Sequence, residues 1–301
     1  RGFSAPIVLD FEQPLSDLYT LLQYDEDPFN QFEAGQLLAH HCLTRLINDY
    51  RSQYDIEYDI EDGYQKDWVP QDKSLNTEIQ QLIEALCPFL ETEADYAFSA
   101  AVLTLPSVVS VVAKLPTADY FAAQAASAYL KKNIASQLES VLKATYNQLQ
   151  EKGAEKDLDP ISKEAMAYRD LKNVCLHYLT QLDTHLAKKQ FEEANNMTDK
   201  LAALKCLCQE TSEAKAEALK AFYQEYKDNS LLMNKWLALQ SSAESGIILD
   251  DIKKLEKDTV FDAKNPNKIR ALYGAFGQNF IHFHQPNGEG YTFFAEKVLA
   301  V

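Results

Sequence analysis

The chain has 301 residues, of which 46% are hydrophobic and 25% are charged, and its formal net charge at neutral pH is −16. This composition is typical of a globular protein with a core of its own, and the negative charge argues against binding to nucleic acid or to an anionic membrane surface. No apolar run approaches the roughly 18 residues of a membrane-spanning helix and no signal peptide begins at Arg1, so we expect a cytoplasmic protein.

The first eleven residues are predicted to include a strand. Residues 4–11 read SAPIVLDF, a short run that contains β-branched side chains. Because a lone strand is not stable in water, we interpret residues 1–11 as the tail of a preceding β domain. From Pro14 onward the apolar spacing becomes helical, and residues 12–301 are predicted to form an α-helical domain.

Helical periodicity then continues along the chain, and prolines or short polar segments separate its stretches. The predicted helices cover residues 15–22, 29–50, 76–87, 92–104, 107–115, 117–152, 162–180, 198–209, 212–227, 230–240, 248–257 and 265–276, with a last helix after Gly290. Helices of this length with short connections pack on their neighbours, so the expected fold is all-α, an α-solenoid or irregular helical superhelix. The sequence has no repeat of fixed period.

Residues 51–74 interrupt this pattern with an acidic insertion in which apolar and acidic residues alternate. An EF-hand interpretation fails, because placing Gly63 at the sixth loop position puts Tyr58 and Val69 where calcium ligands are required. We predict a solvated loop, and the alternation also allows an extended segment or edge strand.

The cysteines predict reduced thiols rather than a disulfide framework, because they are odd in number and most lie within apolar helical sequence. They are Cys42, Cys87, Cys175, Cys206 and Cys208.

The segment from Asn265 to Tyr291 has the most specific sequence, NPNKIRALYGAFGQNFIHFHQPNGEGY. Pro266 suits the first turn of a helix, where no amide donor is needed, and Asn265 or Asn267 supplies the capping oxygen. Residues 279–290 follow as an irregular loop with an unusual density of His, Pro and Gly.

Candidate catalytic and metal-binding residues are absent. Zinc peptidase chemistry requires two histidines one helical turn apart and a glutamate, but none of the six histidines begins an H-E-x-x-H motif. Adjacent His40 and His41 point about 100° apart on a helix, so they do not chelate one ion. His282 and His284 lack further ligands nearby, and we expect His284 to fix the loop's backbone by hydrogen bonds instead.

The chain resembles the C-terminal region of bacterial-type aminopeptidase N, a family of zinc-dependent aminopeptidases. The matching positions of the most specific segment are Asn265, Pro266, Asn267, Ile269, Arg270, Phe283, His284, Asn287, Gly288, Gly290 and Tyr291. Further matching runs are FSAP from Phe3, DPF from Asp27, LTLPS from Leu103, LKNVCL from Leu171, QFEEANNMTDKLAAL from Gln190 and MNKWLALQ from Met233. The resemblance therefore spans nearly the whole chain.

This resemblance implies a non-catalytic helical domain that caps the active-site cavity of a peptidase and limits substrate access. The parent enzyme would remove N-terminal amino acids from peptides, with zinc held in a catalytic domain that this sequence does not contain. The implied partners are that catalytic domain, a β-sandwich domain of the same polypeptide and peptide substrates. We expect neither nucleic acid nor membrane as a partner.

Five positions are predicted to contact the cavity or a neighbouring domain, and no residue is predicted to be catalytic, cofactor-binding or metal-binding. They are Asn265, Arg270, Asn279, His284 and Tyr291. For Arg270 an ion pair with an acidic neighbour of its own domain is the favoured alternative. The run EANNMTD is interpreted as a helix start that Asn196 or Thr198 caps.

Two further expectations concern the chain as a whole. Residue Val301 falls inside the last predicted helix, so we expect the domain to be truncated there and to expose apolar surface. The alternative to the peptidase domain is a stand-alone acidic helical scaffold that binds proteins or peptides, which the lack of catalytic residues favours.

Overall fold

A computed structural model of the protein describes residues 11, 13–54, 68–209, 211–246 and 248–300. Within these residues every regular element is a helix, which confirms the all-α prediction. Residues 4–10 of the predicted strand and most of the acidic insertion lie outside the described residues.

The helices follow the predicted order closely. They are α1 (Leu15–Tyr24), α2 (Pro28–Gln53), α3 (Ser74–Leu86), α4 (Pro88–Glu91), α5 (Tyr96–Leu103), α6 (Val108–Val112), α7 (Tyr120–Gln137), α8 (Glu139–Lys152), α9 (Lys163–Leu179), α10 (His185–Glu193), α11 (Met197–Leu207), α12 (Glu213–Tyr226), α13 (Ser230–Ser241), α14 (Ile248–Leu255), α15 (Pro266–Ile269), the π-helical turn η2 (Arg270–Gly274), α16 (Ala275–Gly277), α17 (Phe280–Phe283) and α18 (Glu289–Ala300).

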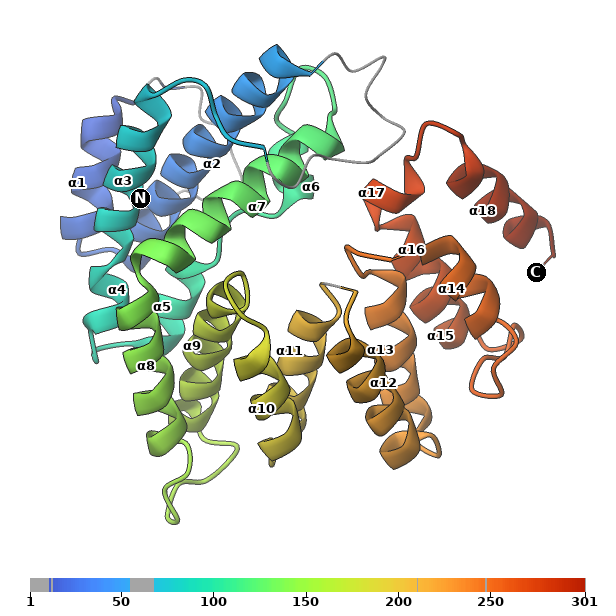
Figure 1. The fold of residues 1–301 in the computed structure, drawn as a ribbon. Coiled ribbons are helices and arrows are strands. Elements are labelled where there is room, and N and C mark those ends of the chain that lie inside the picture. Colours follow the sequence, from blue (N-terminus) through green and yellow to red (C-terminus); the bar gives the residue numbers. More distant parts are fainter. Residues whose placement is uncertain (1–10, 12, 55–67, 210, 247, 301) are drawn as a thin grey trace, which may run out of the picture.

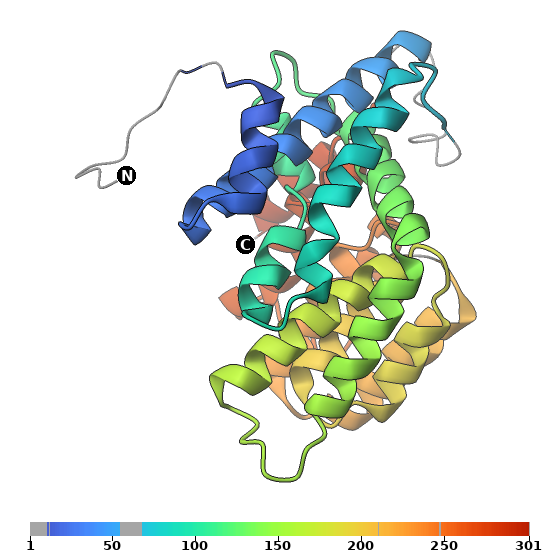
Figure 2. The same cartoon turned by 90° about the vertical axis from the view of Figure 1, so that its left-hand side faces the viewer.

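Together the helices form a curved superhelix. Helices that follow one another pack side by side, as α1 does on α2, α8 on α9 and α10 on α11. Figure 1 shows the resulting arc, which runs from α1–α3 through α8–α13 to α18. Figure 2, turned by 90°, shows the non-helical connection between α8 and α9 projecting beyond the helices. The architecture is the irregular superhelix that the sequence predicts.

Side-chain caps explain why many of these helices begin where they do. An oxygen of the capping side chain accepts a hydrogen bond from a backbone N–H in the first turn, which otherwise has no partner. These caps are Asp27, Asp95, Ser107, Asp119, Ser162, Asn196, Ser212, Asn229 and Asn265. Of the predicted alternatives, Asn265 rather than Asn267 caps α15, and Asn196 rather than Thr198 caps α11.

The structure differs from the sequence prediction in several helical segments. The single helix predicted for residues 117–152 is divided at Leu138, whose backbone angles (φ −103°, ψ 13°) separate α7 from α8 and leave its side chain buried. Helix α10 was not predicted, because its short sequence is rich in Lys and Glu. The loop predicted for residues 279–290 contains the turn α17 and the start of α18.

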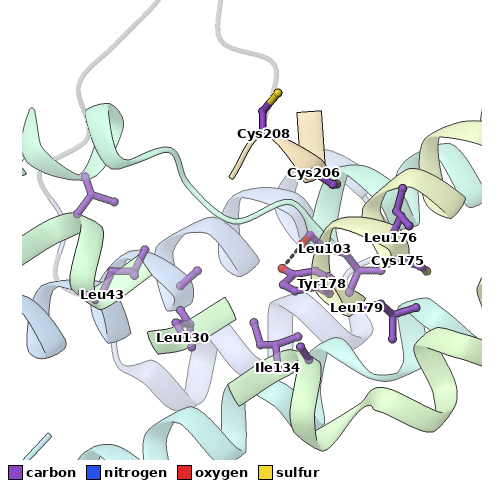
Figure 3. Close-up of a cluster of buried hydrophobic side chains, with 14 of the residues drawn as sticks. Leu43, Leu103, Leu130, Ile134, Cys175, Leu176, Tyr178, Leu179, Cys206 and Cys208 are labelled. Carbon is purple, nitrogen blue, oxygen red and sulfur yellow. Dashed lines mark hydrogen bonds between the residues drawn. The ribbon is translucent and has the colours of Figure 1, made fainter. Parts of the chain in front are cut away.

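Buried hydrophobic side chains form a core between the packed helices of the arc. Figure 3 shows part of it, where the Tyr178 hydroxyl donates a hydrogen bond of 2.6 Å to the Leu103 carbonyl and ties α9 to α5. All five cysteines are free, as predicted, and burial raises the pKa of the Cys175 thiol to about 12. A thiol of that pKa is protonated at neutral pH and is a weak nucleophile.

A buried polar network joins α8, α9, α10 and α11. The Lys172 ammonium lies 2.7 Å from a carboxylate oxygen of Asp199, and both side chains are less than a tenth exposed. Asn196 donates to the same carboxylate, Gln190 donates to the Asp199 carbonyl, and the Tyr146 hydroxyl donates to Gln190. Buried polar groups need such partners, so the network fixes how these four helices pack. The run EANNMTD therefore does more than begin a helix.

Candidate functional site: the inner cavity

The concave side of the superhelix carries a partly open cavity of about 1070 Å³, here named the inner cavity. Its wall comes from α5, α6, α7, α9, α11 and α17, together with the loop that follows α13. A second cavity of about 510 Å³ lies between α7, α9 and Trp68. The two share lining residues, so they meet at these side chains: Gln124, Lys131, His177, Cys206 and Glu244.

Beside this cavity, α7 and α17 touch across the arc. The Tyr120 ring, at the start of α7, stacks on Phe280 and His284 with ring centroids 4.6 and 4.9 Å away. Nearby, the Gln124 amide donates a hydrogen bond of 2.7 Å to the Glu244 carboxylate, 120 positions along the chain. We name the stack of Tyr120, Phe280 and His284 the aromatic closure. It joins segments that are far apart in sequence and turns the arc into a ring.

Asn279 holds the C-terminal side of this ring in place. Its side chain is buried, and its amide donates to the Ser241 and Ala243 carbonyls at 3.0 and 2.9 Å. His282 adds a contact of 3.2 Å between Nε2 and the Glu244 carbonyl. These bonds fix the loop after α13 against α17, and so they position the Glu244 carboxylate at the junction of the two cavities.

The cavity wall carries lysines and acidic residues together with a neutral histidine. Lys131 of α7, His177 of α9 and Lys205 of α11 all line it. Burial, and to a smaller extent these two ammonium groups, lower the pKa of His177 to about 3. The Cys206 thiol has its pKa raised to about 11 by burial, and the same lysines act against that rise.

The lowered pKa of His177 predicts how the stability of the domain depends on pH. Because the His177 pKa is lower in the folded state than its ordinary 6.5, the unfolded chain binds more protons between pH 6.5 and about 3. Stability is therefore complete above pH 6.5 and falls on acidification, by on the order of 1 kcal/mol per pH unit for this group. Urea unfolding of the wild type and of His177→Asn across this range measures the difference. If the free energy of unfolding changes equally with pH in the two proteins, the lowered pKa of His177 is contradicted.

The five predicted contact residues do not form one site. Asn279 lines the inner cavity, whereas His284 belongs to the aromatic closure and its Nδ1 lies 2.5 Å from the Tyr291 hydroxyl. That partner is a side chain, so the backbone role predicted for His284 is wrong. Asn265 caps α15, and Arg270 is exposed and donates to the Asn267 amide oxygen at 3.3 Å. Within the described residues Arg270 forms no ion pair, which corrects the favoured interpretation.

Among the described residues, no group of three or more His, Cys, Asp or Glu side chains is placed to hold a metal ion. His282 contacts the loop after α13, while His284 stacks on Tyr120, so the two rings serve different contacts. None of the described helices is both long and apolar enough to cross a membrane.

The sequence does not predict the residues that line both cavities. Gln124, His177 and Glu244 come from three distant segments, and each looks like an ordinary polar residue of a helix or loop. Only the curvature of the superhelix brings them together. The one available signal was Asn279, which lies beside them in the cavity wall.

Known proteins resemble this chain along its whole length. The family model described as "Domain of unknown function (DUF3458_C) ARM repeats" matches residues 15–301. Aminopeptidase N of Escherichia coli (strain K12) is 32% identical over 304 residues, which cover 98% of this chain and 32% of that protein. Aminopeptidase N of Haemophilus influenzae is 28% identical over 301 residues, which cover 99% of this chain and 32% of that protein.

A solved structure agrees with these relatives. Legionella pneumophila aminopeptidase A, crystallised in complex with aspartic acid, superposes with a TM-score of 0.79 at 26% identity. The match covers 98% of this chain and 33% of that chain. The chain therefore spans about a third of the length of the proteins that it matches.

Proposed function

The chain belongs to the DUF3458_C family of ARM-repeat domains, as the C-terminal helical domain of an aminopeptidase N, and from this premise we propose that it caps the active-site cavity of that enzyme and limits which substrates enter. In this proposal the parent enzyme removes N-terminal residues from peptides. The partners of the domain are the catalytic and β-sandwich domains of the same polypeptide.

The observation that carries the proposal is the ring of helices around the inner cavity, which α7 and α17 complete. A volume of about 1070 Å³ is at the upper end of cavities that hold small ligands, so it admits a short peptide and excludes a folded protein. The aromatic closure sets the width of this space, because Phe280 both lines the cavity and stacks on Tyr120. A wall of this kind selects substrates by size and takes no part in bond cleavage.

Catalysis is assigned to the rest of the polypeptide. A zinc ion needs three or four ligands, and the described residues provide no such group. The zinc that the proposal requires would be held by the catalytic domain, and no step of hydrolysis is assigned to side chains of this chain.

Exposed apolar side chains support contacts with other domains. Tyr24 and Phe29 at the start of the arc, and Val298 and Leu299 in α18, are each at least 65% exposed. Large apolar side chains grouped on a surface are typical of interaction sites. We propose that these two ends of the arc, rather than its middle, contact the neighbouring domains.

Opening the aromatic closure tests the proposal in the full-length enzyme. In a Tyr120→Ala variant the rings of Phe280 and His284 lose their stacking partner, which removes roughly 0.5 to 1.5 kcal/mol per aromatic pair. We expect hydrolysis of an alanyl-anilide to change less than about twofold, whereas cleavage of long peptides increases several-fold as the cavity widens.

A matched variant separates access from general destabilisation. Phe98→Ala removes another aromatic pair, with Phe89, away from the closure. It is expected to leave the ratio of long to short substrate hydrolysis unchanged. The proposal fails if Tyr120→Ala leaves that ratio unchanged too, or if the full-length protein hydrolyses no N-terminal residue at all.

A further inference from the structure

Glu244 presents a carboxylate without a counter-ion to the inner cavity. It lies in the loop after α13 and lines both this cavity and the smaller one beside it. One carboxylate oxygen, Oε2, accepts the 2.7 Å hydrogen bond from the Gln124 amide. Within the described residues the other oxygen, Oε1, accepts no hydrogen bond and is open to solvent. This oxygen is available to a group that enters the cavity.

The cations nearby do not neutralise this carboxylate. Lys131 and Lys205 line the same cavity, but within the described part of the chain neither forms an ion pair with Glu244. Lys215 lies close to the loop and donates to the Ser245 carbonyl at 3.1 Å instead. Because Glu244 is half-buried, its carboxylate has lost part of its hydration without gaining a counter-ion. A cation that reached Oε1 would replace that lost hydration.

The position of the carboxylate is fixed by buried side chains. Gln124 is only 5% exposed and holds Oε2 from α7. On the other side of the loop, the Glu244 carbonyl contacts His282 Nε2 at 3.2 Å, and Asn279 donates to two further carbonyls of the same segment. A group that is held in place before a ligand arrives loses little conformational entropy on binding.

An aromatic surface lies beside the carboxylate. Tyr120 and Gln124 are four positions apart on α7, so their side chains lie on the same face of the helix, one turn from each other. Tyr120 stacks on Phe280 at 4.6 Å, while Gln124 holds Glu244. Phe280 also lines the inner cavity. The cavity therefore offers an apolar ring and a carboxylate about one helical turn apart.

We propose that Glu244 binds the side chain of a lysine or arginine residue of a peptide, and that Phe280 packs against the alkyl stem of that side chain. This assignment rests on the proposed function in taking the ligand to be a peptide. Long basic side chains combine an apolar stem with a charged head, which matches the ring and the carboxylate. The charged head would form charge-assisted hydrogen bonds with Oε1, which are about twice as strong as neutral ones.

The site makes the domain selective for peptide sequence as well as for size. Because hydrolysis is assigned to the catalytic domain, the basic residue held at Glu244 is not the N-terminal residue that is removed but one further along the peptide. In the full-length enzyme, peptides with a lysine or arginine at such a downstream position would be held best.

Binding to the chain itself tests this inference without any catalysis. The probes are N-acetyl-Ala-Arg-Ala-amide and the same peptide with citrulline, the uncharged isostere of arginine, measured by NMR titration at low salt. Both peptides have blocked ends, so the guanidinium is the only charge that differs. We expect the arginine peptide to bind at least about tenfold more tightly. Glu244→Gln keeps an oxygen for Gln124 and should reduce this preference to less than about twofold.

Glu151→Gln is the matched control, because it removes the same charge at an exposed helical position that lines neither of these cavities. It should keep the full preference for the arginine peptide, and circular dichroism checks that every variant is folded. Equal binding of the two peptides, no binding of either, or an equal loss of preference in both variants would overturn the inference. None of these outcomes bears on whether the aromatic closure limits access in the full-length enzyme, which the Tyr120→Ala variant measures separately.

Discussion

Replacement of Asp199 by alanine is expected to destabilise the domain by about 3 to 5 kcal/mol, the typical cost of leaving one member of a buried ion pair without its partner. The Lys172 ammonium, 2.7 Å from the Asp199 carboxylate, would remain buried with only the Gln150 amide oxygen as an acceptor. Asn196 and Asn173 would also lose the carboxylate oxygens that accept their hydrogen bonds. Urea unfolding monitored by circular dichroism measures the change.

An exposed ion pair of similar geometry provides the control. Lys188 and Glu217 join α10 to α12 at 2.9 Å, but their side chains are 41% and 55% exposed. Glu217→Ala should therefore cost less than about 1 kcal/mol. Similar losses for Asp199→Ala and Glu217→Ala would show that burial is not what makes the Lys172 pair important.

Gly290→Ala is the second substitution with a large expected effect. A Cβ at this position would overlap the Phe283 carbonyl oxygen and lie 3.0 Å from the Phe283 Cα, so backbone rather than a flexible side chain opposes it. We expect a loss of about 1 to 3 kcal/mol as α18 moves away from α17. Thermal unfolding gives the size of the loss, and the NMR signals of His284 report the displaced hydrogen bond with Tyr291.

Gly274→Ala is the matched glycine substitution. The nearest atom to a Cβ there is the Cβ of Arg270 at 3.8 Å, an ordinary van der Waals distance. Because alanine favours helix over glycine by up to about 1 kcal/mol, this variant should be neutral or slightly more stable. If both alanines are tolerated equally, α18 does not pack on the Phe283 backbone as described.

Local sequence signals were enough to predict most of the fold. The cap and proline at Asn265 and Pro266 marked the start of α15, because a helix start is set by residues within one turn of it. Leu138 carries no such local signal for the break between α7 and α8. Its side chain fits the helical periodicity on both sides, and the break there follows from packing between helices rather than from its own preference.

The candidate site was much harder to predict. Tyr120 and Phe280 are 160 positions apart, and their stacking depends on the summed curvature of every helix between them. Nor did the sequence predict the π-helical turn at Arg270–Gly274, which interrupts an otherwise regular helical pattern. Residue types alone predict neither the ring stacking nor the π-helical turn, because tyrosine, phenylalanine and histidine also occur as ordinary residues of a helical core.

The closure between α7 and α17 also bears on how the domain folds. Most other contacts join helices that are neighbours in the chain, and such local contacts form quickly. The meeting of Tyr120 with Phe280 is a long loop closure, whose entropic cost is recovered only once the intervening helices are in place. A nascent chain would thus assemble an open crescent first and become a ring only once α17 has formed.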